Sequence, residues 1–282
     1  MDKNKQQTIS SGLYLVSTPI GNMEDITYRA LNILRNSDFI LCEDTRRSAK
    51  LLFYFKIKKK LLSFHKFNEK KVTGKIIDLI KNGKIISLIS DAGTPIISDP
   101  GLTLVKACIG ENLNVTPIPG ASAVTAAISA SGFSDKYIFY GFLSKKESEV
   151  DKVLKNFVNL DFSIVFFVPI SKVNFYISKF KSYFQNRKIV LAKEMTKIHE
   201  NFIRNDVEKI KNLPEAEKGE FTVVLSEIIK LKNVKKEINE SVKVDIKKML
   251  KKYSHKDVVE FISKRENLPK KIIYDFCLLV KK

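Results

Sequence analysis

Residues 85–101 have the sequence IISLISDAGTPIISDPG, in which an unbroken apolar segment ends in a loop of small and turn-forming residues. The apolar part, 85–89, is typical of a strand that is buried on both faces of a parallel sheet, and residues 102–108 after the loop have apolar side chains at helical spacing. The loop therefore follows the carboxyl end of a strand, where open α/β sheets bind ligands. An ordinary strand-to-helix turn is the alternative interpretation of this single loop.

Two more apolar segments end in loops of the same composition. Residues 13–17 lead into Thr-Pro-Ile-Gly-Asn at 18–22, and the short segment 114–116 leads into Pro-Ile-Pro-Gly-Ala-Ser-Ala at 117–123. Because the carboxyl ends of parallel strands lie at one edge of a sheet, we expect the three loops to converge on a single cleft. None of them contains the glycine pattern of a dinucleotide site or of a P-loop, so a different ligand is indicated.

The composition is that of a folded and strongly basic protein. Its 282 residues are 44% hydrophobic, which is enough for two moderate domains with cores of their own. Fifty Lys and Arg against 31 Asp and Glu give a net charge of +19, which suits a polyanionic partner such as RNA. Since Lys outnumbers Arg 43 to 7, a general compositional bias is the alternative explanation of part of this charge.

The Cys and His residues indicate neither disulfides nor a metal site. Cys42, Cys108 and Cys277 lie in apolar segments without Cys-x-x-Cys spacing, and the three His are far apart in the sequence. No apolar run approaches the roughly 18 residues that span a bilayer, and residues 1–7 are polar. We therefore expect a cytoplasmic protein with no membrane segment and no metal.

Charged residues follow the apolar segment 39–42 directly, in the sequence Glu43-Asp44-Thr45-Arg46-Arg47. Two of the seven Arg of the chain are adjacent here, at a predicted strand end, where a planar guanidinium can bind phosphate bidentately. The alternative is an exposed helix start whose acidic residues are favoured by the helix dipole.

The chain is predicted to have three parts. Residues 1–132 form a first α/β domain, and residues 133–235 form a second in which helices and strands alternate, with a helix at 206–212 before a last strand at 221–225. Residues 243–282 contain three helical patterns, with 12 Lys and Arg against 5 Asp and Glu. This tail is predicted to be a basic helical unit that contacts RNA, and a dimer-stabilising appendage is the alternative.

Five segments of the chain match, in order and spacing, the motifs of one known family. They are TPIGN (18–22), EDTR (43–46), SDAGTP with DPG (90–95 and 99–101), PGASA (119–123) and GFL (141–143). Over nearly the whole chain from about Gly12, these residues resemble the ribosomal RNA small subunit methyltransferase I family of the tetrapyrrole methylase superfamily. The resemblance implies a two-domain α/β fold with mostly parallel sheets, a small C-terminal helical tail domain and a homodimer.

The same resemblance implies an activity and a partner. The activity is 2'-O-ribose methylation of a cytidine in the decoding region of 16S rRNA, in the small ribosomal subunit, with S-adenosylmethionine as methyl donor. By resemblance, the donor would contact Pro19, Asp91, Gly93, Thr94, Ile97, Ser122, Ala123 and Val168.

The resemblance and the chemistry of the reaction also suggest residues that act on the RNA. Arg46 and Arg47 would hold RNA phosphate, and Asn68 and Lys193 match motif positions on the substrate side. A base that accepts the ribose proton would add about 10²- to 10⁴-fold to the rate. Asp44, His65 and Glu194 are the candidates for this base. A hydrogen-bonded structural role stays open for His65, and a surface ion pair stays open for Lys193 and Glu194.

The chain departs from the family pattern in two places. Relatives have a His-Asp-His-Asn-Glu-like sequence where this chain has HKFNE at 65–69, and Phe-Tyr-Glu-Ser-x-His-Arg where it has FVPISKV at 167–173. The second departure removes a Glu and a His-Arg pair. The missing residues leave open a non-catalytic RNA-binding assembly factor. A tetrapyrrole C-methyltransferase that acts on a soluble macrocycle with the same fold is a second alternative.

Overall fold

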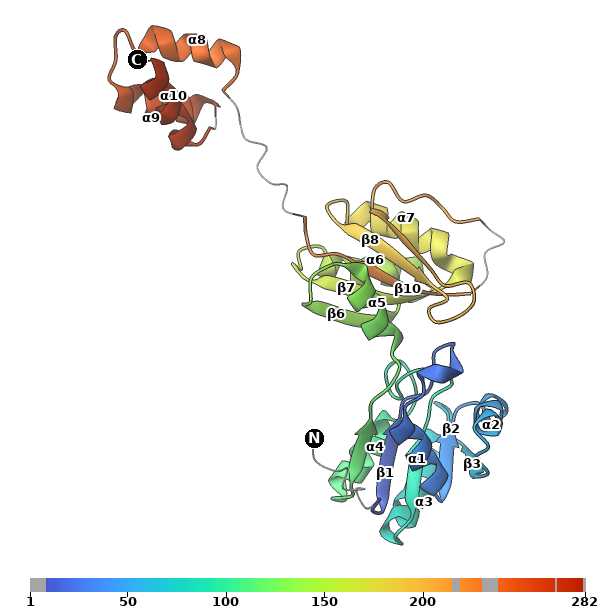
Figure 1. Cartoon of the computed structure of the whole chain (residues 1–282). Coiled ribbons are helices and arrows are strands. Elements are labelled where there is room, and N and C mark those ends of the chain that lie inside the picture. The colour runs from blue at the N-terminus through green and yellow to red at the C-terminus, as the bar shows by residue number, and fades with distance from the viewer. Residues whose placement is uncertain (1–8, 215–218, 230–237, 267, 281–282) are drawn as a thin grey trace. The chain divides into compact units, whose positions relative to one another are not determined.

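The computed structural model describes residues 9–214, 219–229, 238–266 and 268–280. Contacts between residues divide the chain into two compact units, Met1–Ile229 and Lys230–Lys282. Within the described residues, the first unit contains two five-stranded sheets and the second contains helices only (Figure 1). The predicted end of the second domain, residue 235, lies outside the described residues.

Five parallel strands form the first sheet, as predicted, in the order β3-β2-β4-β1-β5. Successive side chains of a strand point to opposite faces, so Tyr14 and Val16 enter one core and Leu13 enters another. Burial on both faces explains the unbroken apolar runs of the sequence. The strands are β1 (Gly12–Val16), β2 (Phe39–Cys42), β3 (Lys60–Ser63), β4 (Ile85–Leu88) and β5 (Val115–Ile118).

Helices contribute to the cores on both faces of this sheet, α1 and α2 to one and α3 and α4 to the other (Figure 1). The chain leaves β1 toward β2 and leaves β4 toward β5, so the strand order reverses between the neighbours β1 and β4. Such a switch point is where open α/β sheets bind ligands. The helices are η1 (Met23–Asp25), α1 (Tyr28–Asn36), α2 (Thr45–Tyr54), α3 (Glu69–Lys81) and α4 (Leu102–Gly110).

The second sheet is mixed, which corrects the prediction that both sheets are mostly parallel. Its strand order is β6-β7-β10-β8-β9, and only β6 and β7 pair in parallel. The strands are β6 (Tyr137–Phe142), β7 (Ser163–Pro169), β8 (Lys188–Lys193), β9 (Asn201–Asp206) and β10 (Glu220–Leu225).

The antiparallel pairings follow from the way β8, β9 and β10 are connected. Residues 207–209 form a turn where a helix at 206–212 was predicted, and the preceding residues form β9, which was not predicted. Neighbouring parallel strands need a crossover of a dozen or more residues, usually a helix. Only residues 194–200 join β8 to β9, so these strands pair antiparallel.

Helices also pack on both faces of the second sheet. Helix α5 (Ala123–Ser131) packs on one face, and α6 (Glu147–Phe157) and α7 (Val173–Tyr183), which follows the short helix η2 (Ile170–Lys172), pack on the other. The chain therefore passes from the first sheet to the second between β5 and α5. The domain boundary between residues 132 and 133 stays a prediction, because the contacts group Met1–Ile229 as one unit.

One buried cation fastens the end of α6 to the second sheet. The guanidinium of Arg187, a residue only 2% exposed, donates hydrogen bonds to the main-chain carbonyls of Phe157, Val158, Leu160, Phe162 and Ser226. Carbonyls at the end of a helix have no partner within the helix and carry partial negative charge, so a cation is favourable there.

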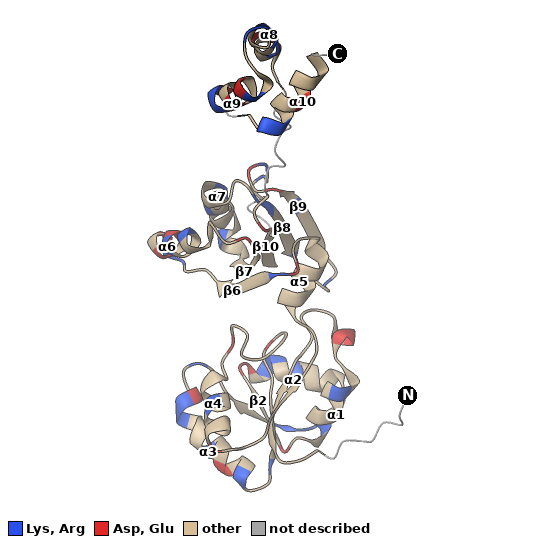
Figure 2. Ribbon diagram, turned by 90° about the vertical axis from the view of Figure 1, so that its left-hand side faces the viewer, with Lys and Arg blue, Asp and Glu red and all other residues tan. Residues whose placement is uncertain are grey.

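In its described residues, the second unit contains three helices around an apolar core of its own. They are α8 (Glu240–Met249), α9 (His255–Glu266) and α10 (Lys270–Val280), and Figure 2 shows Lys and Arg on all three. The predicted small helical tail is confirmed, and its contact with RNA stays a prediction.

Candidate functional site

The loops that follow β1 and β4 are joined by main-chain hydrogen bonds at the switch point. Thr18 and Gly93 exchange two such bonds, with N to O distances of 2.9 Å and 3.0 Å. Gly93 has a φ of +79°, a left-handed conformation that glycine adopts without steric strain. The Thr18 hydroxyl also donates to the Ser90 carbonyl at 3.2 Å, so the two loops are held together at the carboxyl edge of the sheet.

The loop after β5 joins the same cluster. The Thr94 hydroxyl lies 3.1 Å from the Ser17 hydroxyl and donates to the Ala121 carbonyl at 3.3 Å. Gly120 packs against Ser17 so closely that a Cβ at Gly120 would lie 2.8 Å from the Ser17 Cβ. The predicted convergence of the three loops is confirmed.

A cavity of about 450 Å³ opens at these loops. Its volume is in the range of pockets that bind small molecules, roughly 300–1,000 Å³. One wall comes from the central loop and the start of α5, and the other comes from the second sheet, where β7 ends and β10 begins. The site is therefore built from both sheets of the first unit.

Seven of the eight residues predicted to bind the donor line this cavity. They are Asp91, Gly93, Thr94, Ile97, Ser122, Ala123 and Val168. Pro19 is buried and its neighbour Ile20 lines the cavity instead. Arg47, one of the predicted RNA contacts, lies at the same cavity. The contact of these residues with a donor or with RNA stays a prediction.

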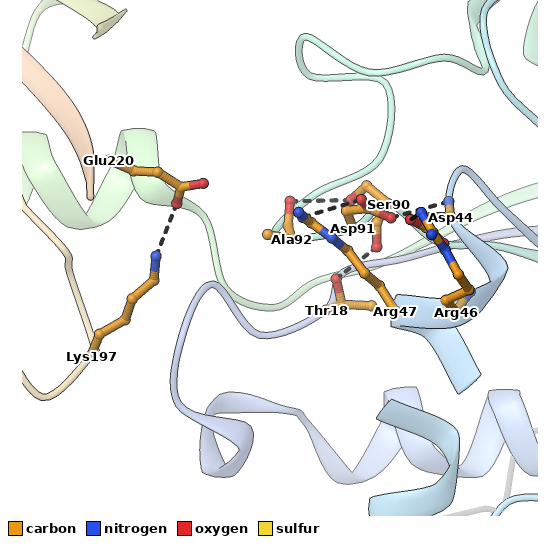
Figure 3. A network of polar contacts seen from close by, with 9 residues as sticks. All are labelled: Thr18, Asp44, Arg46, Arg47, Ser90, Asp91, Ala92, Lys197 and Glu220. Atoms are coloured by element: carbon orange, nitrogen blue, oxygen red, sulfur yellow. Dashed lines mark hydrogen bonds and ion pairs between the residues drawn. The ribbon is translucent and has the colours of Figure 1, made fainter. Parts of the chain in front are cut away.

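Asp91 is oriented by two partners at the start of α2 (Figure 3). Its carboxylate accepts a hydrogen bond from the main-chain N–H of Asp44 at 3.2 Å and pairs with Nη1 of Arg47 at 3.3 Å. Two cooperating contacts therefore fix a carboxylate in the cavity wall.

Asp44 itself has a structural role at the first turn of α2. Its carboxylate accepts a hydrogen bond from the Arg46 main-chain N–H at 2.9 Å and lies 2.7 Å from Nη2 of the same residue. Hydrogen bonds from Arg46 hold the pKa of Asp44 well below its usual range. A carboxylate with so low a pKa is a weak proton acceptor, and neither Asp44 nor Arg46 lines the cavity.

Asp99, which was not among the predicted candidates, places a further carboxylate in the cavity wall. Burial, together with the charges of Glu43 and Asp91, raises the pKa of Asp99 to about 6, and a hydrogen bond with Ser90 opposes the shift. The motif Asp99-Pro100-Gly101 was visible in the sequence. The raised pKa that singles out Asp99 depends first on its burial and then on the charges of Glu43 and Asp91, and these surroundings exist only in the folded chain.

Two residues of the central loop have strained backbone conformations. Ile96 and Ser98 have φ angles of +75° and +72°, which are rare outside glycine and rarest for a β-branched residue. Strain of about 1–3 kcal/mol per residue persists only where the surrounding structure holds it, and it gathers at binding sites. Ile97, between them, lines the cavity.

The central loop ends at α4, and a residue distant in sequence caps this helix. Gly101 precedes the helix and has no side chain, but Oε1 of Glu69 accepts hydrogen bonds from the main-chain N–H groups of Thr103 and Leu104, at 2.8 Å and 3.3 Å. Unpaired N–H groups of a first helical turn need such acceptors. Glu69 thus fixes the point at which the loop ends.

Two predicted residues that precede Glu69 lie away from the cavity. Oδ1 of Asn68 accepts a hydrogen bond from the His65 main-chain N–H at 2.8 Å, and Nδ1 of His65 accepts one from Phe67 at 3.3 Å. These bonds close the turn between β3 and α3. Neither His65 nor Asn68 lines the cavity, and their predicted catalytic and substrate roles stay predictions.

Glu194 lines a second, more open groove of about 720 Å³. The groove is bounded by residues 21–23, by Tyr54 at the end of α2 and by the loop after β8. The Glu194 carboxylate accepts a hydrogen bond from the Glu220 main-chain N–H at 2.8 Å and pairs with Lys197 at 3.0 Å, and Figure 3 shows Lys197 paired with Glu220 as well. Glu194 therefore links the ends of β8 and β10. Lys193, the last residue of β8, lines neither the groove nor the cavity.

The segment that departs from the family pattern forms part of the cavity wall. Pro169, Ile170 and Ser171 line the cavity, and Pro169 stands where the pattern has Glu. The acidic groups of the wall are instead Asp91, Asp99 and Glu220. A carboxylate at position 169 is therefore replaced by an apolar surface.

No helix in the described part of the chain is both long enough and apolar enough to cross a bilayer. Among the same residues, no group of three or more His, Cys, Asp or Glu side chains is placed to hold a metal ion.

Two low-identity solved structures share the fold of this chain. Diphthine synthase superposes with a TM-score of 0.61 at 15% identity, over 76% of this chain and 89% of its own. Uroporphyrin-III C-methyltransferase from Thermus thermophilus, in complex with S-adenosylhomocysteine, superposes with a TM-score of 0.52 at 12% identity, over 78% of this chain and 99% of its own.

Sequence comparison gives closer relationships. The sequence profile of the tetrapyrrole (corrin/porphyrin) methylases matches residues 12–211. The ribosomal RNA small subunit methyltransferase I of Thermotoga maritima is 44% identical over 217 residues, which cover 76% of this chain and 97% of that protein. The protein of the same name from Neisseria meningitidis serogroup A is 33% identical over 283 residues, which cover 99% of this chain and 97% of that protein. These sequence matches show that this chain, which has the three-loop cavity at its switch point, belongs to the ribosomal RNA small subunit methyltransferase I family of tetrapyrrole methylases.

Proposed function

We propose that this protein transfers a methyl group from S-adenosylmethionine to the ribose 2'-hydroxyl of a cytidine in the decoding region of 16S rRNA. As a member of its family the protein is a methyltransferase of small-subunit rRNA, and the nucleotide and the atom are the finer part of the proposal. The observation that carries the proposal is the cavity at the switch point, where both sheets surround the residues expected to hold the donor.

The cavity has features that a bound sulfonium nucleoside requires. Gly93 lines it in a left-handed conformation, and a Cβ there would come within 3.3 Å of Ile20 Cγ2, so glycine leaves the backbone open to a ligand. Asp91 offers acceptor oxygens to hydroxyl or ammonium groups, and Ile97 and Val168 offer apolar surface. When bound, S-adenosylmethionine supplies an electrophilic methyl group on a positively charged sulfur.

Asp99 is the residue that we propose as the base. Attack by the ribose oxygen forms a C–O bond while the bond between the methyl group and the donor sulfur breaks and its electron pair stays on sulfur. The 2'-hydroxyl proton must leave in this step, and a carboxylate in the cavity wall can accept it. Since burial and the charges of Glu43 and Asp91 raise the pKa of Asp99 only to about 6, the group is ionised at neutral pH. We prefer it to Asp44, His65 and Glu194 because those three do not line the cavity.

Methylation of purified small ribosomal subunits tests the proposal. Subunits from cells that lack the protein are incubated with enzyme and labelled donor, and the modified nucleotide is mapped by mass spectrometry of nuclease digests. We expect one 2'-O-methylated cytidine in the decoding region. For Asp99→Asn we expect a fall in turnover of about 10²-fold or more, with donor affinity measured by calorimetry close to that of the wild type.

Other outcomes of this assay would contradict the proposal in distinguishable ways. Label on a base instead of a ribose would refute the 2'-O assignment. Transfer to a soluble tetrapyrrole, with none to RNA, would favour the C-methyltransferase alternative. A protein that releases no heat with the donor would be a non-catalytic RNA-binding factor.

We also propose that the tail, residues 243–282, contacts the rRNA. Lys and Arg on α8, α9 and the start of α10 support this role, because counterion release makes phosphate binding favourable (Figure 2). Deletion of these residues should weaken binding to the small subunit and leave donor affinity unchanged, whereas an equal loss of both would contradict the proposal. We further expect a cytoplasmic homodimer, and a monomeric mass by light scattering would contradict that expectation.

A further inference from the structure

The exposed face of α2 combines basic and aromatic side chains. The side chains of Arg46 and Arg47 are 88% and 68% exposed, and Phe53 and Tyr54 are 85% and 58% exposed. Lys50, also exposed, lies one turn from both groups, because residues three and four apart are neighbours on a helix surface. We call these five residues the α2 track.

The chain segment that contains the α2 track is strongly basic, although Asp44 pairs with Arg46 and Asp91 pairs with Arg47. Residues 45–60, which include α2 and the turn after it, contain seven Lys and Arg and no Asp or Glu. Figure 2 shows basic residues on the α2 ribbon. A local excess of positive charge of this size attracts a polyanion. It disfavours a protein partner whose surface carries no negative charge.

The α2 track begins at the cavity and ends at the second groove. Arg47 lines the cavity, and Tyr54 lines the groove formed with residues 21–23 and the loop after β8. Seven helical residues separate the two, a rise of about 10 Å.

The two rings provide surfaces suited to nucleic-acid bases. The Tyr54 ring contacts the edge of the Phe55 ring, with centroids 4.8 Å apart and planes inclined by 77°. That contact orients the Tyr54 ring, while the adjacent Phe53 ring is open to water. Adjacent exposed aromatic side chains are unfavourable in water and mark a binding surface.

We propose that the α2 track binds a single-stranded segment of the RNA substrate beside the target nucleotide, with bases stacked on Phe53 and Tyr54 and phosphates on Arg46, Arg47 and Lys50. Unpaired bases are required because a duplex keeps its bases stacked inside, where exposed rings cannot reach them. The target's identity, but not the binding mode, rests on the proposed function.

Fluorescence anisotropy with the full-length protein tests this proposal. The probes are a labelled 12-nucleotide unstructured RNA and the same sequence as a duplex. We expect the double variant Phe53→Ala/Tyr54→Ala to bind the single strand about 10- to 100-fold more weakly, with less than about a threefold change for the duplex. For Lys50→Ala, we expect the slope of log affinity against log salt to fall by about 0.7.

Matched controls come from α4, which packs in the core on the opposite face of the sheet. Ile109 is an exposed apolar residue there, and Lys106 is an exposed cation. Ile109→Ala and Lys106→Ala should leave the affinity for the single strand and its salt dependence unchanged. Thermal melting and donor binding should be unchanged in all variants.

Three results would overturn the proposal. The first is single-strand affinity of the double variant within twofold of the wild type. The second is an equal loss for single strand and duplex. The third is a change of oligomeric state by light scattering with RNA affinity intact, which would make this face a protein interface. A wild type that binds single strands through the α2 track but methylates no cytidine would refute the proposed function alone.

Discussion

Removal of the Glu69 carboxylate should destabilise the end of the central loop that leads into α4. Glu69 is 9% exposed, and one of its oxygens caps two N–H groups of α4, whose preceding residue Gly101 has no side chain. Loss of an N-cap costs about 0.5–2 kcal/mol, and loss of a charged acceptor from buried donors costs about 1.5–3 kcal/mol. We therefore expect Glu69→Ala to lower the free energy of unfolding by about 2 kcal/mol.

The expected changes are measurable in two assays. In a folding unit of this size, 2 kcal/mol corresponds to a fall in Tm of roughly 4–8 °C by calorimetry. If donor binding must supply the whole of this free energy to order the loop again, the Kd for S-adenosylmethionine rises by at most about 30-fold. Glu69→Gln keeps an acceptor oxygen but not its charge, so its effect should lie between those of Ala and wild type.

A matched carboxylate at the other end of α4 serves as the control. Glu111 follows this helix and pairs with Lys81 on the surface at 2.8 Å, and exposed pairs contribute only about 0–1 kcal/mol. Glu111→Ala should therefore change Tm little and leave donor affinity unchanged. A Glu69→Ala protein that melts within about 1 °C of the wild type, far less than the expected fall of roughly 4–8 °C, would refute the capping argument.

Three further predictions follow from the same structure. Gly93→Val places a branched side chain at a φ of +79° beside Ile20, which costs about 1–2 kcal/mol and fills the donor's approach; calorimetry should detect no donor binding, and unchanged affinity would contradict the loop assignment. The folded-state pKa of Asp99, about 6, lies above its ordinary 3.8, so its contribution to stability is fully present below pH 3.8 and is lost as pH rises through 6. Asp99→Asn should therefore raise Tm at about pH 8, above that window, but not at about pH 4, near its lower end, and a gain at both pH values would argue against a buried charge. Arg187→Met leaves five carbonyls without their donor and should destabilise the protein by about 3–5 kcal/mol in urea unfolding, with donor affinity retained in the folded state; a loss below about 1 kcal/mol would show that water replaces the guanidinium.

The sequence was a good guide to the first sheet and a poorer guide to the second. In the first sheet every strand is followed by a helix, so the alternation of apolar runs and helical patterns predicts parallel pairing directly. In the second sheet β10 lies between β7 and β8, which precede it in the chain, and β9 has a mixed burial pattern that resembles a loop. The position of β10 between two strands that precede it in the chain cannot be predicted from local periodicity, because periodicity reports only on residues that are near in sequence.

The candidate site shows the same division. Seven of the eight residues expected to hold the donor line the cavity, because Gly and Pro loops at strand ends are visible as local composition. The candidate bases were chosen by residue type, and the chain places Asp44 in a helix cap, His65 in a turn and Glu194 in a link between strands. These local uses of polar side chains depend on contacts that composition does not reveal.

By itself, the sequence determined the parallel sheet, the three loops at its carboxyl edge and the basic tail, because each depends on neighbours along the chain. Only the tertiary structure decided that Asp99 is the carboxylate with a raised pKa, that Glu69 caps a helix 34 residues away, and that the second sheet is mixed. Desolvation, charge coupling and strand pairing are set by groups that are distant in sequence and meet only when the chain has folded.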